Sequence, residues 1–249
     1  MQLDGKVALV TGGTKGIGAA TAIALARAGA DVAVNGRHAD ADAAEVKAAI
    51  EGLGRRCVVV VADMAEADQA TRCVAETAER LGPPQVLVHS AGGGIAGGLM
   101  EIEPDAWHRA FDVHVHAVYH LCRAAVPAMQ ERREGAIVLV ASVAGLRGVA
   151  WSLCYQVVKG ALPQFARALA RQFADDNIRV NCVAPGIIRT RFHDNMSDEQ
   201  KRLNLEHRIP LHREGTPEQV AGLVLQLVQN DYITGETVAI DGGLTMRIA

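Results

Sequence analysis

Tyr155 and Lys159 have the side-chain types and the spacing that proton transfer requires. They lie four positions apart in the run Tyr-Gln-Val-Val-Lys, so on a helix both side chains share one face. A free tyrosine has a pKa of about 10, and a neighbouring cation lowers that value. The pair therefore suits general acid–base chemistry at a carbonyl or an alcohol. Because similar pairs occur on many solvated helices, its significance depends on a nucleotide site elsewhere in the chain.

A pattern that predicts such a nucleotide site lies near the N-terminus. Residues 7–10 form a short apolar run that predicts a buried strand. The run Thr-Gly-Gly-Thr-Lys-Gly-Ile-Gly at 11–18 follows, and an alanine-rich helical stretch then ends at Gly29. Glycines let the backbone approach a pyrophosphate closely, and a helix N-terminus offers free N–H groups to phosphates. Strand, turn and helix together predict a dinucleotide site.

The rest of the chain alternates between apolar runs and helical patterns. The runs that predict strands are 6–10, 31–35, 56–61, 85–88, 136–141, 178–182 and 237–240. The helical patterns are 16–28, 40–53, 66–81, 104–130, 152–174 and 217–229. This alternation predicts an α/β protein, a single Rossmann-fold domain over residues 1–249. Its seven-stranded, mostly parallel, doubly wound sheet would carry helices on both faces, and ligands would bind at the carboxyl ends of the strands.

The bulk composition excludes several functional classes. The 249 residues include 25 basic and 28 acidic side chains, and this balance does not favour a nucleic-acid or membrane partner. No uncharged apolar run approaches the length of a transmembrane helix, and the first strand begins too early to leave room for a signal peptide. The five cysteines are scattered and form no Cys-x-x-Cys pair, which favours a reducing, cytoplasmic location.

These patterns together resemble the short-chain dehydrogenase/reductase family over almost the whole chain. Residues 11–18 fit the family's T-G-x-x-x-G-x-G cofactor motif, and residues 155–159 fit its Y-x-x-x-K catalytic motif. Residues 181–190 fit N-x-x-x-P-G-x-x-x-T, and residues 209–218 resemble the I-P-L-G-R-x-G-T-P-E of tetrameric β-ketoacyl reductases and related sugar dehydrogenases. The resemblance implies hydride transfer between a nicotinamide and a carbonyl or secondary alcohol. It also implies a homotetramer and a substrate lid at about 187–213.

The resemblance also assigns catalytic roles. Tyr155 would donate the proton in reduction and accept it in oxidation, Lys159 would lower the pKa of Tyr155 and contact the nicotinamide ribose, and Ser142 would bond the substrate oxygen. The family's fourth member is an asparagine whose main-chain carbonyl holds a relay water, and here it aligns with His114. The family's N-N-A-G is likewise replaced by His-Ser-Ala-Gly at 89–92. His114 could offer the same carbonyl or shuttle protons through its imidazole; we favour the carbonyl.

The expected cofactor is NADP(H) in preference to NAD(H). The acid that usually bonds the ribose 2′-OH is replaced by Gly36-Arg37, and an arginine there can bind a 2′-phosphate. Lys15 adds a second cation, a combination that goes with NADP in the family, while Asp63 resembles the adenine-contacting aspartate. The expected cofactor-binding residues are Gly12, Thr14, Lys15, Gly16, Ile17, Gly18, Arg37, Asp63, Met64, Ser90, Ala91, Gly92, Tyr155, Lys159, Pro185, Gly186, Ile188 and Thr190.

An alternative function is a dinucleotide-binding sensor or scaffold that has lost turnover. His114 and the missing asparagines of the N-N-A-G motif support this interpretation. The intact Ser142, Tyr155 and Lys159 argue against it, because a silent scaffold has no need of all three.

Other side chains invite further interpretations. His116 and His120 share a helix face, but no acid apart from Asp112 completes a set nearby, so we expect no metal. Trp151 and Phe192 would form walls of the substrate pocket, or simply pack as large apolar residues do. The sequence does not identify the substrate.

Overall fold

The computed structural model describes residues 1–150, 152–190 and 196–246. Its centre is a seven-stranded sheet in the order β3-β2-β1-β4-β5-β6-β7, in which every neighbouring pair is parallel. The strands are β1 (Val7–Thr11), β2 (Asp31–Gly36), β3 (Cys57–Val61), β4 (Val86–His89), β5 (Gly135–Val140), β6 (Ile178–Pro185) and β7 (Thr237–Ile240). The predicted doubly wound Rossmann fold is confirmed, and the order of the strands reverses between β1 and β4.

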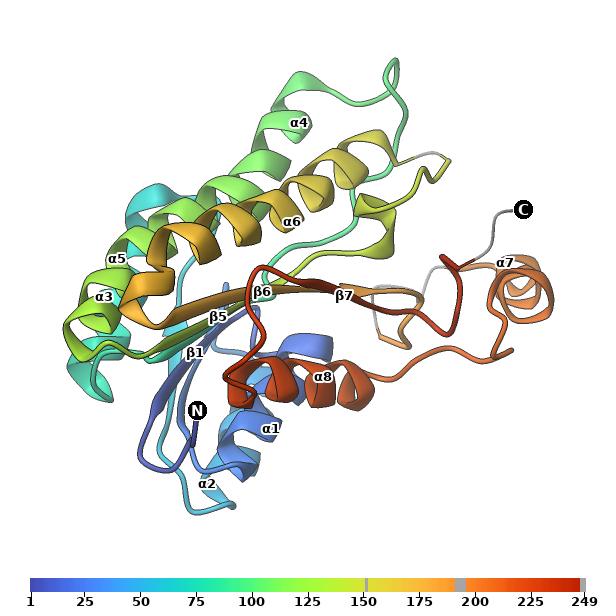
Figure 1. The fold of residues 1–249 in the computed structure, drawn as a ribbon. Helices are drawn as coiled ribbons and strands as arrows, with labels where there is room; N and C mark the ends of the chain where they lie inside the picture. Colours follow the sequence, from blue (N-terminus) through green and yellow to red (C-terminus); the bar gives the residue numbers. More distant parts are fainter. Residues whose placement is uncertain (151, 191–195, 247–249) are drawn as a thin grey trace.

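Helices cover both faces of this sheet (Figure 1). The first face carries α3 (Ala67–Arg80), α5 (Ala117–Arg132) and α6 (Leu153–Phe173). The second face carries α1 (Gly16–Arg27), α2 (Ala41–Glu51) and α8 (Pro217–Gln229). Leu9 of β1 packs into the core on the first face and Val10 into the core on the second. Because both faces are covered, the strands are continuous apolar runs rather than alternating ones.

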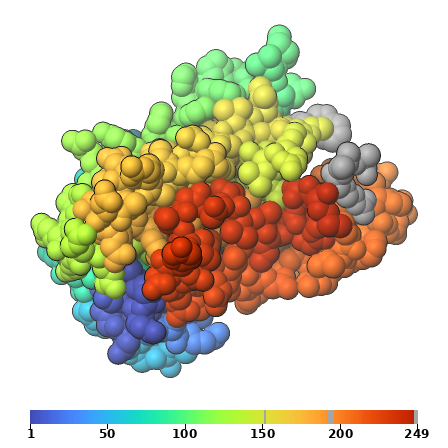
Figure 2. All heavy atoms as spheres, viewed as in Figure 1, coloured from blue at the N-terminus to red at the C-terminus, as the bar shows by residue number. Residues whose placement is uncertain are grey.

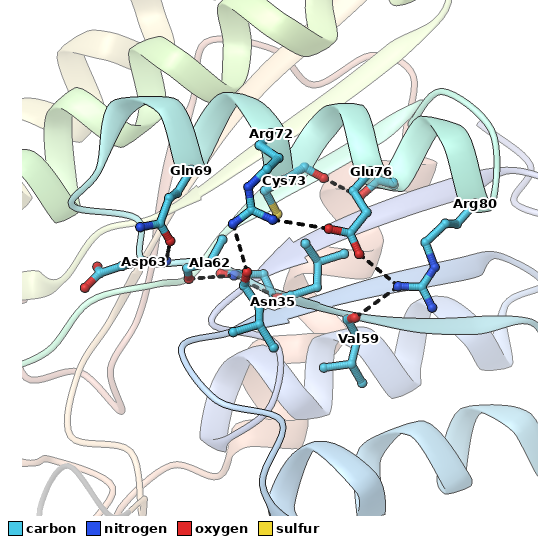
Figure 3. A network of polar contacts seen from close by, with 12 residues as sticks. Asn35, Val59, Ala62, Asp63, Gln69, Arg72, Cys73, Glu76 and Arg80 are labelled. Atoms are coloured by element: carbon cyan, nitrogen blue, oxygen red, sulfur yellow. Dashed lines mark hydrogen bonds and ion pairs between the residues drawn. The ribbon is translucent and has the colours of Figure 1, made fainter.

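The edge strand β3 is protected by side chains from α3 (Figure 3). Arg80 donates to the carbonyl oxygen of Val59 at 3.3 Å, and Arg72 donates to that of Val61 at 3.2 Å. Glu76 lies between the two arginines and pairs with both. Carbonyl groups that have no strand partner on this side are thereby satisfied, which blunts an edge that could otherwise pair with another chain.

The helix predicted at 104–130 is interrupted. The structure contains α4 (Pro104–Phe111), a π-helical turn at Asp112–His116, and then α5. A single π turn is wider than an α turn and shifts the side chains that follow it, yet it leaves the apolar pattern on either side intact. The sequence pattern therefore could not reveal it. His114 lies in the middle of this turn.

Residues 196–216, which precede α8, form a lobe at the carboxyl end of the sheet, seen at the right in Figure 1 and as the orange surface in Figure 2. It contains α7 (Asp198–Leu203) and a second π-helical turn at Asn204–Arg208. A capping box between Ser197 and Gln200 begins α7. None of the helices in the described part of the chain has the length and apolarity to cross a membrane.

Candidate active site

A cleft of about 1880 Å³ opens along the carboxyl ends of the strands. This volume exceeds the roughly 300–1,000 Å³ of a common small-ligand pocket, so the cleft has room for a dinucleotide and a substrate together. All the cofactor-binding and catalytic residues predicted from the sequence line it. Trp151 and Phe192, predicted as pocket walls, lie outside the described residues.

The glycine turn after β1 packs directly on the loop after β4. Gly12 has a φ of +62°, and a Cβ atom there would lie 2.8 Å from the main chain of Ala91. Asn35, buried at the end of β2, holds the turn in place: its Oδ1 accepts from Gly12 N–H at 3.3 Å, and its main-chain oxygen accepts from Gly13 N–H at 2.9 Å. No role was assigned to Asn35 from the sequence. A single amide side chain at the end of an apolar strand could have indicated one.

The N-terminus of α1 is available to an anion. Its N-cap residue Lys15 makes no side-chain capping bond, whereas Asp40 caps α2 and Thr216 caps α8. The first-turn residues of α1 line the cleft, so their N–H groups and the positive end of the helix dipole serve the cleft instead of a capping side chain. This arrangement fits the pyrophosphate of a dinucleotide.

The cation predicted at the glycine turn is already paired. The Lys15 ammonium lies 2.8 Å from a carboxylate oxygen of Asp40 and 2.9 Å from one of Asp42. The hydrogen bonds to Asp40 and then Asp42 raise the pKa of Lys15. Arg37 lines the same part of the cleft, and no described acid lies within 4.0 Å of its guanidinium. A 2′-phosphate would meet Arg37 unpaired and would share Lys15 with two carboxylates.

The predicted adenine contact, Asp63, is also engaged. Arg109 of α4 reaches its carboxylate at 2.6 Å. Burial acts to raise the pKa of Asp63, but the hydrogen bonds from Ala65 N–H and Arg109 outweigh it and leave the pKa lowered. Sequence reasoning missed Arg109 because it is 46 positions away and no local pattern connects the two residues.

The pKa of Tyr155 is shifted in the direction opposite to the one expected. Partial burial raises the pKa of Tyr155, and a hydrogen bond with Ser142 offsets this only in part. The Lys159 ammonium lies 5.8 Å from the centre of the Tyr155 ring and donates to the carbonyl oxygen of Val140 at 2.7 Å. The predicted lowering of the Tyr155 pKa by Lys159 is therefore wrong for this structure, because desolvation of the phenol outweighs the hydrogen bond with Ser142. Burial also lowers the pKa of Lys159 itself to about 8.

The two histidines that replace family asparagines tie the π turn to the β4 end. His89 is bonded through Nδ1 to Thr11 Oγ1 at 2.9 Å and through Nε2 to the carbonyl oxygen of Val113 at 3.1 Å. His114 is bonded through Nε2 to the carbonyl oxygen of Gly93 at 3.2 Å. A carbonyl only accepts, so each Nε2 carries the hydrogen and donates it.

His114 is held as a neutral ring against the catalytic tyrosine. Its ring centre is 6.1 Å from that of Tyr155 in an edge-on arrangement, and it fills space that a Cβ at Gly92 would enter, 2.0 Å from the imidazole carbon Cε1. Burial, followed by the charges of Lys159 and His89, lowers the pKa of His114 to about 2. An imidazole that stays neutral at physiological pH is a poor proton shuttle there. The geometry favours the main-chain role, which stays a prediction.

Other side chains near the cleft take structural positions. His116 bonds Asp112 at 2.8 Å, and among the described residues no group of three or more His, Cys, Asp or Glu side chains could hold a metal ion. Cys154 is buried, and burial raises the pKa of its thiol. Ser152 donates to the carbonyl oxygen of Ile95 at 3.0 Å, away from the serine role assigned to Ser142.

Comparison with known proteins agrees with this geometry. Residues 12–245 match the family described as enoyl-(acyl carrier protein) reductase. The chain is 36% identical to L-rhamnose 1-dehydrogenase (NAD(P)(+)) of Sphingomonas sp. over 250 residues, which cover 99% of this chain and 98% of the relative. It is 34% identical to 3-oxoacyl-[acyl-carrier-protein] reductase of Chlamydia muridarum, with 97% of this chain and 98% of the relative covered.

A solved structure shares the same fold. L-sorbose reductase from Gluconobacter frateurii, complexed with NADPH and L-sorbose, superposes with a TM-score of 0.91 at 31% identity, covering 100% of this chain and 99% of that one. The likeness thus extends over the whole sheet and the lobe as well as the motifs. The chain belongs to the short-chain dehydrogenase/reductase family, in the branch of the ketoacyl reductases and sugar dehydrogenases.

Proposed function

We propose that this protein is an NADP(H)-dependent oxidoreductase that interconverts a carbonyl compound and a secondary alcohol. The observation that carries the proposal is the meeting of Ser142, Tyr155 and Lys159 in the same cleft as the uncapped N-terminus of α1. A cleft that only stored a nucleotide would not need a half-buried phenol bonded to a serine hydroxyl.

Different residues of the cleft would hold different parts of the cofactor. The glycine turn and the first turn of α1 suit the pyrophosphate, Arg37 and Lys15 suit the 2′-phosphate, and Lys159 suits the nicotinamide ribose. When bound, the nicotinamide supplies or accepts the hydride at the substrate carbon. The NADPH in the L-sorbose reductase complex supports this assignment, while the name of the rhamnose dehydrogenase relative covers both NAD and NADP.

Tyr155 is the residue that moves the proton at the substrate oxygen. Its raised pKa keeps the phenol protonated at neutral pH, which is the form that donates during reduction. Ser142 bonds the phenol and lies where it can also bond the reacting oxygen. Lys159, fixed by the Val140 carbonyl, is available to hold the nicotinamide ribose beside the phenol.

A screen of NADPH oxidation against mixed ketones and aldehydes tests the proposal. Turnover by the parent protein and its loss in Tyr155→Phe would support it. Binding of NADPH with no turnover of any substrate would instead support the alternative of a sensor or scaffold. Parallel titrations with NADPH and NADH, followed by cofactor fluorescence, test the expected NADP preference.

The proposal includes a cytoplasmic homotetramer and a lid. Tyr119 of α5 and Val157 of α6 are apolar side chains exposed by 50% and 42%, on the two helices that this family packs against their copies. Met196, Asn204, His207 and Arg208 of the 187–213 segment line the cleft, which supports a lid role for this segment. Light scattering at micromolar concentration tests the assembly, and the mass of a single 26.3 kDa chain would contradict it.

A further inference from the structure

The charges that line the cleft are distributed unevenly. Every carboxylate among the described lining residues comes from the β2–α2 and β3–α3 side of the sheet, and these are Asp40, Asp42, Glu45 and Asp63. The described lining residues that follow β5 and β6 include no carboxylate. Apart from the catalytic pair, their ionisable side chains are Arg147, His207 and Arg208. The part of the cleft around Tyr155 is therefore basic.

Arg147 belongs to a loop that is fastened to the catalytic helix. Gln156, next to Tyr155 on α6, accepts from Val149 N–H at 2.7 Å and donates to the Val149 carbonyl oxygen at 2.5 Å. This pair of bonds fixes the loop that carries Arg147 relative to the phenol. Arg147 itself donates to the carbonyl oxygen of its neighbour Leu146 at 2.9 Å, and no described acid lies within 4.0 Å of it.

Arg208, in the segment that follows β6, is held by a buried amide. Asn204 is only 3% exposed, its Oδ1 accepts from Arg208 at 2.9 Å, and its Nδ2 contacts the sulfur of Met196 at 3.1 Å. As with Arg147, none of the described acids is within ion-pair distance of Arg208. By contrast, Arg109 on the other side of the cleft is paired with Asp63. Two guanidinium groups that line a binding cleft without acidic partners are suited to an anionic ligand.

We propose that the substrate carries an oxyanion, a carboxylate or a phosphate, held by Arg147 and Arg208 while its carbonyl group reacts at Tyr155. This inference rests on the proposed function and narrows its substrate class to keto acids, hydroxy acids or their phosphorylated counterparts. The anionic group is an anchor and is unchanged in the reaction. The carbonyl carbon is reduced by the two electrons of the hydride from NADPH, and the carbonyl oxygen gains its proton from Tyr155.

Matched substrates provide the test. The rates of NADPH oxidation are compared for levulinate and methyl levulinate, for acetoacetate and methyl acetoacetate, and for dihydroxyacetone phosphate and dihydroxyacetone. Each pair keeps the carbonyl and changes the charge, and the phosphate pair distinguishes the two kinds of oxyanion. The variants are Arg147→Gln and Arg208→Gln. Arg202→Gln on α7 is the matched control, because Arg202 is exposed and does not line the cleft.

The expected result is a kcat/KM at least about tenfold higher for one class of anion than for its neutral partner. Each arginine variant should raise KM for that anion about tenfold or more, the loss typical of one charge-assisted hydrogen bond. The neutral partner, the NADPH affinity and the Arg202→Gln control should stay within about twofold.

Three results would overturn the inference. Neutral partners could react as well as anions, the arginine variants could leave the preference for anions unchanged, or the variants could weaken NADPH binding, which would assign the arginines to the cofactor. Each of these leaves the proposed function standing. If no member of any pair is reduced although NADPH binds, the proposed function itself fails.

Discussion

On the β1–β3 side of the cleft, two of the lining cations are already paired with acids, whereas on the β5–β6 side Arg147 and Arg208 have no described acidic partner. An anionic ligand on the first side must compete with the acids that are already paired with Lys15 and Arg109. A ligand on the second side meets cations whose charge is not offset. The proposed cofactor would thus meet cations whose charge is partly offset, and the proposed anionic substrate would meet cations without described acidic partners.

The two sides also differ in what shifts the pKa values of their ionisable groups. Near Tyr155, burial raises the pKa of the phenol, lowers that of Lys159 to about 8, and lowers that of His89 to about 3. On the other side, the hydrogen bond with Lys15 lowers the pKa of Asp40, and at Asp63 the hydrogen bonds from Ala65 N–H and Arg109 together outweigh desolvation and lower the pKa. Desolvation thus sets the direction of the pKa shifts around Tyr155, whereas hydrogen bonds set it at Asp40 and Asp63.

The strongest test of the catalytic side is Tyr155→Phe. We expect turnover to fall by about 10²–10⁴-fold, the range for loss of a general acid, while the Kd for NADPH changes little. Steady-state kinetics and cofactor fluorescence measure the two effects. Tyr232→Phe, at an exposed tyrosine outside the cleft lining, is the control that should keep full activity. Substantial turnover in Tyr155→Phe would remove Tyr155 from its role.

The folded protein should lose stability at acid pH, because it keeps two buried histidines neutral. The folded-state pKa values are about 3 for His89 and about 2 for His114, below the roughly 6.5 of an unfolded histidine. Below pH 6.5 the unfolded chain therefore binds protons that the folded chain refuses, so stability falls as pH falls from 6.5 towards 3. Each histidine contributes up to about 1.4 kcal/mol per pH unit.

Urea denaturation between pH 7 and 5 measures this loss. Because other groups titrate as well, the informative quantity is the difference between the parent and His114→Asn, which should lose stability less steeply. His116→Asn serves as the control for the same substitution at an exposed histidine of the same π turn. Equal slopes in the parent and His114→Asn would contradict a buried neutral imidazole.

On the nucleotide side, Arg37→Asp should weaken NADPH binding by about 1.5–3 kcal/mol, the value of a lost charge-assisted contact. The new carboxylate would repel a 2′-phosphate and could bond a free 2′-OH, so preference should shift towards NADH. Titration of both cofactors against parent and variant supplies an internal control. Equal NADPH and NADH affinities in the parent would count against the expected role of Arg37.

A smaller effect is expected from Asp42→Asn. This change removes one of two carboxylates from Lys15, which leaves the ammonium freer to meet a 2′-phosphate. Because the Lys15 side chain is half exposed and its ion pairs are screened by solvent, the gain in NADPH affinity should be small, and the change for NADH should be close to zero. Weaker NADPH binding would mean that Asp42 positions Lys15 rather than competing for it. Asp198→Asn on α7, outside the cleft lining, is the control.

The smallest change in activity is expected for His114→Asn. If residue 114 supplies only its main-chain carbonyl to a relay water, asparagine should keep or raise the rate near neutral pH. The pH–rate profiles of parent and variant decide between the roles. A large loss of rate, together with a missing titration near pH 7, would show that the imidazole itself carries protons.

The strands, the glycine turn and the Tyr155–Lys159 pair were predictable because each is a local pattern. Apolar runs of buried strands and residues four apart on a helix depend on neighbours along the chain. The predicted strands accordingly agree with the structure to within a few residues, and the catalytic and cofactor-binding residues predicted from the family's motifs all line one cleft.

The tertiary structure decided what those residues touch. The partners of Asp63, Lys15 and His114 lie 46, 25 and 21 positions away along the chain. The π turn at 112–116, which brings His114 and Val113 to their partners at the end of β4, left no trace in the apolar pattern. The direction of the Tyr155 pKa shift also depends on burial, which is set by every element packed around the residue. Hydrogen bonds and desolvation depend on distance in space, so the local pattern of residue types could not determine them.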